Sequence, residues 1–251
     1  MDFLNAIILL ANYIIVPALT YGSQLALGAI GVTLIYGVLR FANFAYGDLM
    51  AFATMIVILT TWYLQSLGIT LGFLPTALLA LPIGIIATII LSLFFDKTVF
   101  KYYRDKKSEP VILIVVSIGV MFILNAIVRI VIGPSDVIFM DGARFIMKAG
   151  EFKKMTGLNE GIALKSTQVI SFATTIITCS ILFYFLNKTK TGKSMRAYSD
   201  NEDLALLSGI DPTKIIIYTW VIVSILATIA GTLYGLDKSF KPFAYWNNLL
   251  P

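Results

Sequence analysis

The chain has 251 residues, of which 58% are hydrophobic and 13% are charged. This charged fraction is about half that of a typical soluble domain. Several stretches long enough to cross a membrane carry no charged residue, among them residues 3–39, 49–95, 111–128 and 215–236. The composition therefore excludes a soluble domain and predicts a membrane protein along almost the whole length.

Two residue types are scarce, which excludes several kinds of chemistry. The chain has no histidine and a single cysteine, Cys179. A Ser-His-Asp triad, a histidine proton relay and a zinc site of cysteine or histidine ligands therefore cannot be built from it. We predict no catalytic residue, no metal site and no cofactor held by this chain.

The first apolar stretch is too long for a single perpendicular span. Residues 3–39 would extend about 55 Å as one helix, whereas the hydrocarbon core of a bilayer is about 30 Å thick. Pro17 is expected to interrupt the stretch, giving a short interfacial or half-inserted helix and then a first span at residues 18–39. The alternative is a short additional span at residues 3–16.

Five further spans are predicted in chain order. The second ends near the interfacial pair Trp62-Tyr63 and the third ends at Phe95. Apolar stretches place the remaining spans at residues 110–132, 166–186 and 214–236. We therefore predict an all-α fold: a polytopic transmembrane helical bundle of about six spans plus a short N-terminal apolar helix, forming one domain over residues 1–251.

The net charge of +5 arises from Lys and Arg residues that lie mainly between the predicted spans. On one side, Arg40, residues 96–109 and residues 188–214 together hold eleven of them. On the other side, residues 133–165 and the end of the chain hold seven. Because loops rich in Lys and Arg stay in the cytoplasm, we predict that the loop at 188–213 is cytoplasmic and that the loop at 133–165 is external. We expect no binding to nucleic acid.

The loop at 188–213 contains a sequence that superficially resembles a nucleotide site. Gly192-Lys193-Ser194 is similar to the end of a phosphate-binding loop, but the full pattern needs glycine at position 187, where the chain has Asn187. The preceding element is also a predicted membrane helix rather than a strand. We therefore predict no nucleotide binding here.

The same loop is predicted to contain a short helix at residues 200–209. Ser199 and Glu202 have the spacing of a capping box, and Gly209 could end the helix in a left-handed conformation. Asp211-Pro212 would then begin the next span. The helix is either a capped surface connector or a docking element for a cytoplasmic partner, since it presents leucines where a solvated connector would present lysines.

Three segments of the chain carry a pattern typical of one family. The first is Tyr36-Gly-Val-Leu-Arg-Phe-Ala-Asn-Phe-Ala-Tyr-Gly-Asp48. The second is Gly192-x-x-x-Arg196-Ala197, followed by Asp200 and by Ala205-x-x-x-Gly209-Ile210, and the third is Ala227-x-x-x-Gly231-x-x-x-Gly235. Together they resemble the permeases of branched-chain amino-acid ABC transporters, and the resemblance covers most of the chain without large gaps.

The resemblance implies one subunit of an importer in a bacterial-type inner membrane. This chain would be surrounded by lipid and paired with a second permease subunit. Two cytoplasmic ATPase subunits would hold ATP and magnesium, and a periplasmic solute-binding protein would deliver the solute. The residues expected to couple the permease to the ATPase are Arg196, Asp200, Leu204, Ala205, Leu207, Gly209 and Ile210.

The expected substrates are branched-chain amino acids, and permeases for urea or short amides share the same motifs. An ion-coupled carrier is less favoured, because paired intramembrane acids and an inverted repeat are not visible in the sequence. Two departures from the family are present. Tyr46 stands where members usually have histidine. Members also continue for several tens of residues with further spans, so we expect a C-terminally truncated sequence or an incomplete subunit.

Polar residues near the end of the first span are candidates to line a translocation pathway. Asn43, Phe44, Gly47 and Asp48 lie where a broken helix would direct polar groups towards a pathway. For Asp48 the local interpretation is favoured, in which its carboxylate caps the second span and Gly47 provides the turn. Asn125, in the middle of the fourth span, is expected to face protein or a cavity rather than lipid.

Small residues recur on two spans. Gly28 and Gly31 lie in the first, and Ala227, Gly231 and Gly235 lie in the sixth. Because small side chains let helix backbones approach closely in a membrane, we predict that these residues pack helices together.

Overall fold

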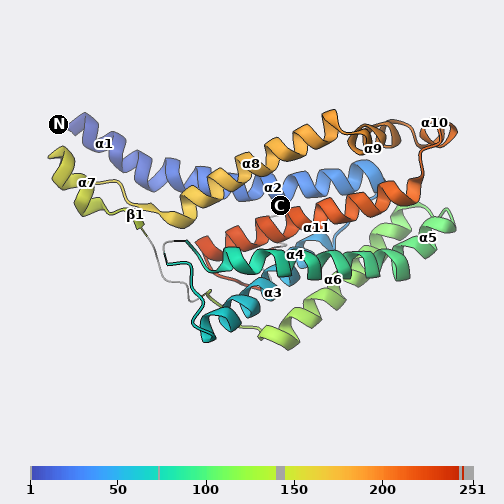
Figure 1. Ribbon diagram of the computed structural model, residues 1–251, viewed down its shortest axis with the longest axis horizontal. Helices are drawn as coiled ribbons and strands as arrows, with labels where there is room; N and C mark the ends of the chain where they lie inside the picture. Colours follow the sequence, from blue (N-terminus) through green and yellow to red (C-terminus); the bar gives the residue numbers. More distant parts are fainter. Residues whose placement is uncertain (1, 73, 140–144, 243–244, 246–251) are drawn as a thin grey trace.

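The computed structural model describes residues 2–72, 74–139, 145–242 and 245. Among these residues, six helices are long and apolar enough to cross a membrane. Figure 1 shows them as an elongated bundle in which most helices run along the long axis of the molecule. The predicted all-α bundle of six spans with an N-terminal apolar helix is confirmed.

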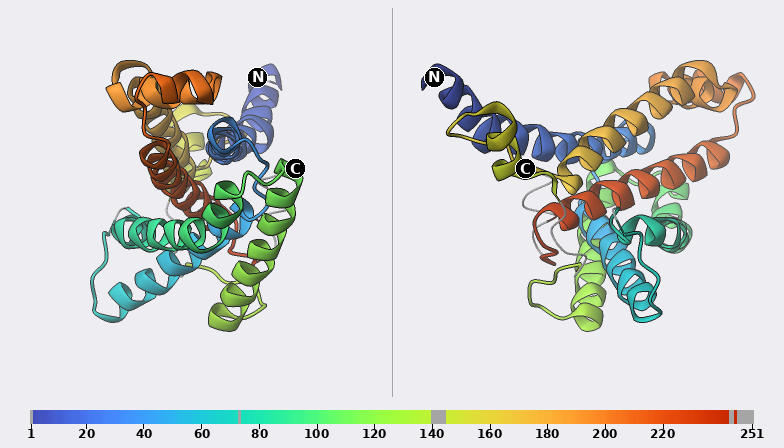
Figure 2. Two further views of the ribbon diagram at one scale, coloured as in Figure 1. Left: turned by 90° about the vertical axis from the view of Figure 1, so that its right-hand side faces the viewer. Right: turned by 60° about the vertical axis from the view of Figure 1, so that its left-hand side comes forward.

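The N-terminal apolar stretch forms one continuous helix, so the predicted interruption at Pro17 is wrong. Helix α1 (Asp2–Leu10) passes through a π-helical turn, η1 (Ala11–Ile15), into α2 (Val16–Leu39). In this turn the amide of Val16 donates to the carbonyl of Ala11, five residues back. The wider turn directly before Pro17 accommodates a residue that has no amide hydrogen, and the helix therefore continues. Figure 2 shows α1 projecting from the bundle.

The other spans follow the sequence prediction closely, with one extension. They are α3 (Tyr46–Ser66), α4 (Ala77–Phe95), α6 (Pro110–Ile132), α8 (Ser166–Lys188) and α11 (Pro212–Asp237). Helix α4 does not end in a loop at Phe95. It continues through a π-helical turn, η2 (Asp96–Phe100), into α5 (Lys101–Asp105).

Helix α11 is the central helix of the bundle. It packs against α2, α3 and α4, and most of its span is buried. Trp220, Val223, Ala227 and Ala230 from this helix are almost completely buried in the main apolar core. Few residues of helix α8 and of the N-terminal part of the first span are buried, and their apolar surface suits contact with lipid.

The small residues of the first and sixth spans lie at helix contacts. A Cβ atom at Gly31 would overlap the hydroxyl of Tyr46, at the start of α3. A Cβ atom at Gly231 would lie 2.9 Å from the carbonyl oxygen of Met50, and one at Gly235 would lie 2.9 Å from the ring of Phe139. The two other positions proposed for packing, Gly28 and Ala227, are buried.

The segments between spans gather at two opposite ends of the bundle. At one end are strand β1 (Phe145–Met147), helix α7 (Ala149–Thr156) and strand β2 (Leu164–Lys165), with β1 and β2 paired antiparallel. At the other end are α9 (Lys190–Asp200) and α10 (Glu202–Leu207). Figure 1 places α5 at the end that holds α9 and α10, as the alternation of spans requires.

Candidate functional site

The loop at 188–213 forms two helices rather than the single predicted one. Residues 190–200 are helical in α9, and Ser199 lies in its last turn, so the capping box predicted at Ser199 is wrong. Its hydroxyl instead donates to the carbonyl of Gly37, at 2.8 Å. The N-cap of α10 is Asn201, whose Oδ1 accepts the amide of Leu204 at 3.0 Å. The second helix therefore begins at Glu202.

The C-terminal end of α10 has the structure that the sequence predicts. Gly209 adopts a left-handed conformation with φ of 79°. Its amide donates to Leu206 O at 3.0 Å, and the amide of Ile210 donates to Ala205 O at 3.1 Å. This pair of bonds defines a Schellman motif. Asp211 then begins α11, because its Oδ1 accepts the amide of Thr213 at 2.9 Å.

Helix α10 has one packed side and one exposed side. Ala205 is buried and, with Ile210, contacts a small cluster formed by Val38, Met195, Tyr198 and Ile215. On the other side, Leu204, Leu206 and Leu207 are 61%, 44% and 85% exposed. We call these three residues the leucine face. Exposed leucines on a short, well-capped helix at the end of a membrane bundle are typical of a protein interaction surface.

The remaining residues proposed for coupling lie beside this face. Arg196 and Asp200 are exposed on α9, and the Arg196 guanidinium donates to Asn187 Oδ1 at 2.9 Å. The hydroxyl of Tyr198 donates to Glu202 Oε1 at 2.8 Å and so ties α9 to α10. Burial, with the hydrogen bond to Glu202 as a second cause, raises the pKa of Tyr198, which keeps this phenol protonated and able to donate.

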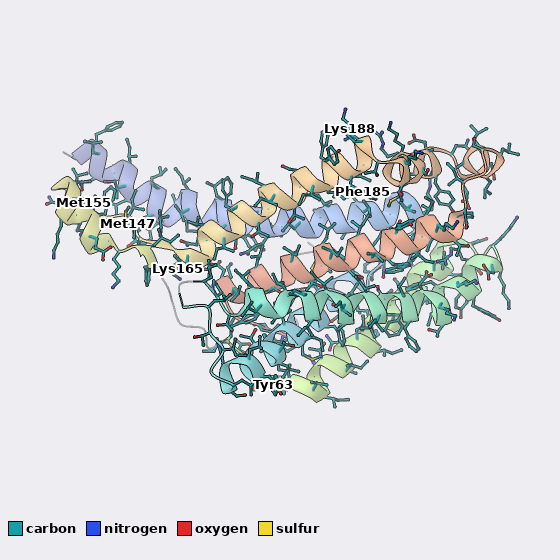
Figure 3. All side chains as sticks on the ribbon, in the orientation of Figure 1. Tyr63, Met147, Met155, Lys165, Phe185 and Lys188 are labelled. Carbon is teal, nitrogen blue, oxygen red and sulfur yellow. The ribbon has the colours of Figure 1, made fainter. Side chains whose placement is uncertain are left out.

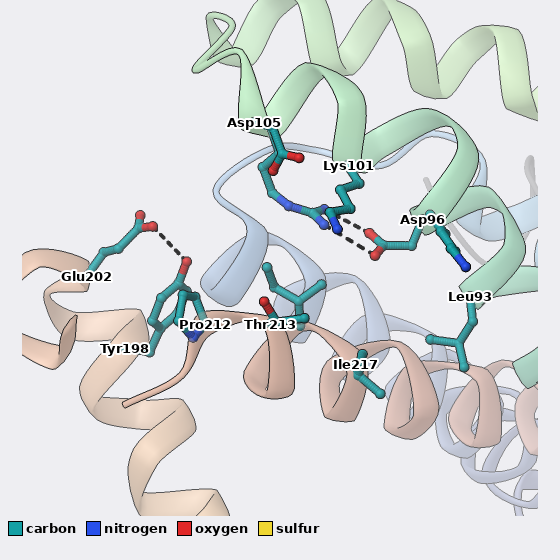
Figure 4. A pocket seen from close by; sticks show the side chains of 12 residues that line it. Leu93, Asp96, Lys101, Asp105, Tyr198, Glu202, Pro212, Thr213 and Ile217 are labelled. Atoms are coloured by element: carbon teal, nitrogen blue, oxygen red, sulfur yellow. Dashed lines mark hydrogen bonds and ion pairs between the residues drawn. The ribbon is translucent and has the colours of Figure 1, made fainter. Parts of the chain in front are cut away.

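A cavity of about 400 Å³ lies between α10, the start of α11 and the extension of α4. Figure 4 shows Tyr198 and Glu202 on one side of it and Asp96 and Lys101 on the other. Arg104 spans both oxygens of Asp96 at 2.7 and 3.2 Å, so η2 and α5 are held together.

Gly192 has a structural role at the corner between α8 and α9. Its amide donates to Thr189 Oγ1 at 3.0 Å, which caps the first turn of α9. A Cβ atom at this position would overlap the carbonyl oxygen of Phe185 and lie 2.6 Å from Leu186 Cα. The glycine is needed here because the backbones of the two helices meet.

The polar residues after the first span surround the start of α3. Asn43 Oδ1 accepts the amide of Ala45 at 3.0 Å, and Asn43 O accepts the amide of Tyr46 at 3.3 Å. The helix therefore begins at Tyr46, and Asp48 lies inside its first turn rather than at the N-cap, contrary to the local interpretation. Gly47 is buried in the same turn.

Asp48 is part of a polar contact between α3 and α6. Its side chain is buried, and Asn125 Nδ2 donates to its Oδ1 at 2.9 Å. Arg129 lies four residues after Asn125, one turn further along α6. We call Asp48, Asn125 and Arg129 the intramembrane cluster. The amide of Phe44 donates to Ser117 Oγ at 3.1 Å, which joins the segment before α3 to α6.

Residues 14–250 match the protein family described as "Branched-chain amino acid transport system / permease component". The chain belongs to this family. It is a multi-pass integral membrane protein and the permease component of a transport system. A polar cluster inside the bundle and an exposed leucine face at its end are features that such a permease can use.

Several curated relatives are similar to this permease. The high-affinity branched-chain amino acid transport system permease protein LivH of Salmonella typhimurium is 26% identical over 220 residues, which cover 86% of this chain and 68% of the relative. BraD of Pseudomonas aeruginosa, of the same description, is 27% identical over 226 residues, covering 89% and 70%. The probable branched-chain amino acid transport permease protein LivH of Methanocaldococcus jannaschii is 28% identical over 231 residues, covering 90% and 66%. No solved structure matches the chain.

Arg40 lies between the leucine face and the intramembrane cluster, and it was not among the site residues predicted from the sequence. Arg40 closes α2, and its guanidinium donates to the carbonyl oxygen of Ser199 at the end of α9. The two residues are 159 positions apart, and the acceptor is a backbone atom. A sequence pattern carries no signal for such a contact, although Arg40 does fall inside the first family segment.

Proposed function

We propose that this permease forms the membrane pathway of an ATP-binding-cassette importer for branched-chain amino acids in the inner membrane. The named relatives support the substrate class. In the proposed assembly the chain pairs with a second permease subunit and receives solute from a periplasmic binding protein. Two cytoplasmic ATPase subunits bind and hydrolyse ATP. Transport is by alternating access of the intramembrane cluster to the two sides of the membrane.

The observation that carries this proposal is the leucine face. Leu207 is 85% exposed at the end of the bundle that holds α9 and α10. The leucine face lies on the side where Lys and Arg residues predominate, which the positive-inside rule assigns to the cytoplasm. In the proposed assembly the leucine face binds in a groove of a cytoplasmic ATPase subunit, and ATP hydrolysis by that subunit drives transport.

Leu207→Glu is expected to release the ATPase. A charged side chain would have to be buried, unpaired, in the groove that now receives leucine, and such burial costs about 2 kcal/mol or more. The measurement is the amount of ATPase that co-purifies with the full-length permease from native membranes. Insertion of the permease into the membrane should be unaffected, because the Leu207 side chain is mostly exposed and makes few contacts within the chain.

Met155→Glu is the matched control. Met155 is 81% exposed on α7, and Figure 3 shows it at the end of the bundle opposite to Phe185 and Lys188. This variant should retain the ATPase. If wild-type permease brings down no ATPase, or if Leu207→Glu retains as much as Met155→Glu, the assignment of the leucine face is wrong.

Asp48→Asn is expected to reduce leucine uptake about tenfold or more while the ATPase still co-purifies. The substitution preserves the shape of the side chain but removes the carboxylate that accepts the hydrogen bond from Asn125. A carboxylate inside the bundle is a suitable partner for the ammonium group of an amino acid. Asp136→Asn is the control, since Asp136 pairs with Lys241 on the surface at 2.9 Å and such pairs contribute little.

Uptake of radiolabelled leucine in cells, with and without excess urea, checks this prediction. Competition by urea in wild type, together with unchanged uptake in Asp48→Asn, would instead favour a permease for a neutral amide. Full uptake by Asp48→Asn would remove the cluster from the pathway.

A further inference from the structure

Arg40 joins the end of the first span to the end of α9. Its backbone is left-handed, with φ of 60°, and closes α2. Its guanidinium donates to the carbonyl oxygen of Ser199 and, at 3.5 Å, to that of Asp200. The last carbonyl groups of a helix have no partner within the helix, and a positive charge is favoured beside them. Arg40 therefore caps the C-terminus of α9.

The same two helices are joined by further contacts around this cap. The hydroxyl of Ser199 donates to the carbonyl of Gly37 at 2.8 Å. Val38 is buried against Met195 and Tyr198 of α9. Because Asn201 begins α10 directly after the capped residues, the leucine face cannot shift far without moving the carbonyl groups that Arg40 holds.

On its other side, Arg40 begins the connector to the intramembrane cluster, residues 40–45. The connector is held firmly: the ring of Phe41 is buried, with its centroid 5.4 Å from that of Phe100. Asn43 accepts from the amide of Ala45, and the amide of Phe44 donates to Ser117 on α6. Asp48 follows within the first turn of α3. A displacement of Arg40 is therefore passed along a short, bonded segment to the cluster.

We propose that Arg40 is the positioning residue that transmits movement of α9 and α10 to the intramembrane cluster. The inference rests on the proposed function, because it takes the ATPase to be what moves α10. When the leucine face is displaced, the carbonyl groups of Ser199 and Asp200 draw the guanidinium with them, and the connector shifts the start of α3 against α6. The leucine face then touches the ATPase, whereas Arg40 relays the motion.

Arg40→Gly separates this role from a purely structural one. Glycine adopts the left-handed conformation without strain, so the turn that closes α2 is preserved while the guanidinium is lost. In proteoliposomes that contain the complete transporter, the ATPase should remain bound and ATP hydrolysis should stay within about twofold of wild type, whereas leucine uptake per ATP should fall about tenfold. Arg40→Lys keeps a cation at the C-terminus of α9 and should restore part of the coupling.

Lys193→Ala is the control, because it removes one positive charge from the exposed surface of α9. Its leucine uptake per ATP should equal that of wild type. Coupling in Arg40→Gly equal to wild type would overturn the proposal. Loss of the ATPase from Arg40→Gly would also overturn it, since Arg40 would then be needed for assembly rather than for transmission. Failure of the wild-type permease to bind any ATPase would instead refute the proposed function itself.

Discussion

Gly192→Ala is expected to detach α9 from α8 and to abolish binding of the ATPase. The added methyl group would overlap the carbonyl oxygen of Phe185 and approach Leu186 Cα to 2.6 Å. These are backbone atoms inside a helix, so they cannot turn away as a side chain can. The cost should reach about 3 kcal/mol, the upper part of the usual range for overpacking. Because the corner between α8 and α9 sets the orientation of α9 and α10, the leucine face should be displaced.

Two measurements check the Gly192→Ala prediction: ATPase co-purification, and protection of residues 188–213 from limited proteolysis. Ser194→Ala is the control on the same helix, since its hydroxyl donates to Lys190 O of that helix, at 3.1 Å. Gly150→Ala on α7 controls for the substitution itself, because a Cβ atom there meets no atom of the described residues within 4 Å. A Gly192→Ala variant that is as protected and as well assembled as these two would contradict the packing argument.

Gly31→Ala is expected to destabilise the bundle by separating α2 from α3. A Cβ atom at this position would overlap the Tyr46 hydroxyl and lie 2.5 Å from Tyr46 Cζ. Tyr46 is completely buried, so its ring has no free space in which to move. Overpacking of this kind costs about 1–3 kcal/mol or more. Thermal unfolding of the purified permease in detergent should therefore begin several degrees lower than in wild type, and uptake should fall because Tyr46 begins the helix that carries Asp48.

Gly22→Ala provides the control on the same helix. Among the residues that the structure describes, none lies within 4 Å of a Cβ atom at Gly22. Because alanine also favours a helix more than glycine does, this variant should be at least as stable as wild type. A double variant gives the sharper test. Tyr46→Leu should by itself leave a cavity, but combined with Gly31→Ala it should regain stability, because each change relieves the other. Strictly additive losses would show that the two residues do not compete for the same space.

Local features of the sequence were enough to predict the caps around α10 in part. Gly209 and Asp211 were identified correctly, because a left-handed glycine and an aspartate before proline are stabilised by bonds to their own neighbours. The role of Ser199 was not predicted correctly, because serine fits both an N-cap and the last turn of a helix. Its bond to Gly37 in another span favours the second position. The π-helical turn before Pro17 likewise has no distinct local pattern.

The sequence alone determined that this chain is a helical membrane protein, where most of its spans lie and which family it resembles, because apolar length and short motifs are properties of consecutive residues. Only the tertiary structure decided which polar groups meet. Asp48 and Asn125 are 77 positions apart, and Arg40 reaches a backbone carbonyl 159 positions away. Inside a bilayer no water can satisfy a buried polar side chain such as that of Asp48, so it needs a partner within the protein, and which partner it meets depends on how the helices pack.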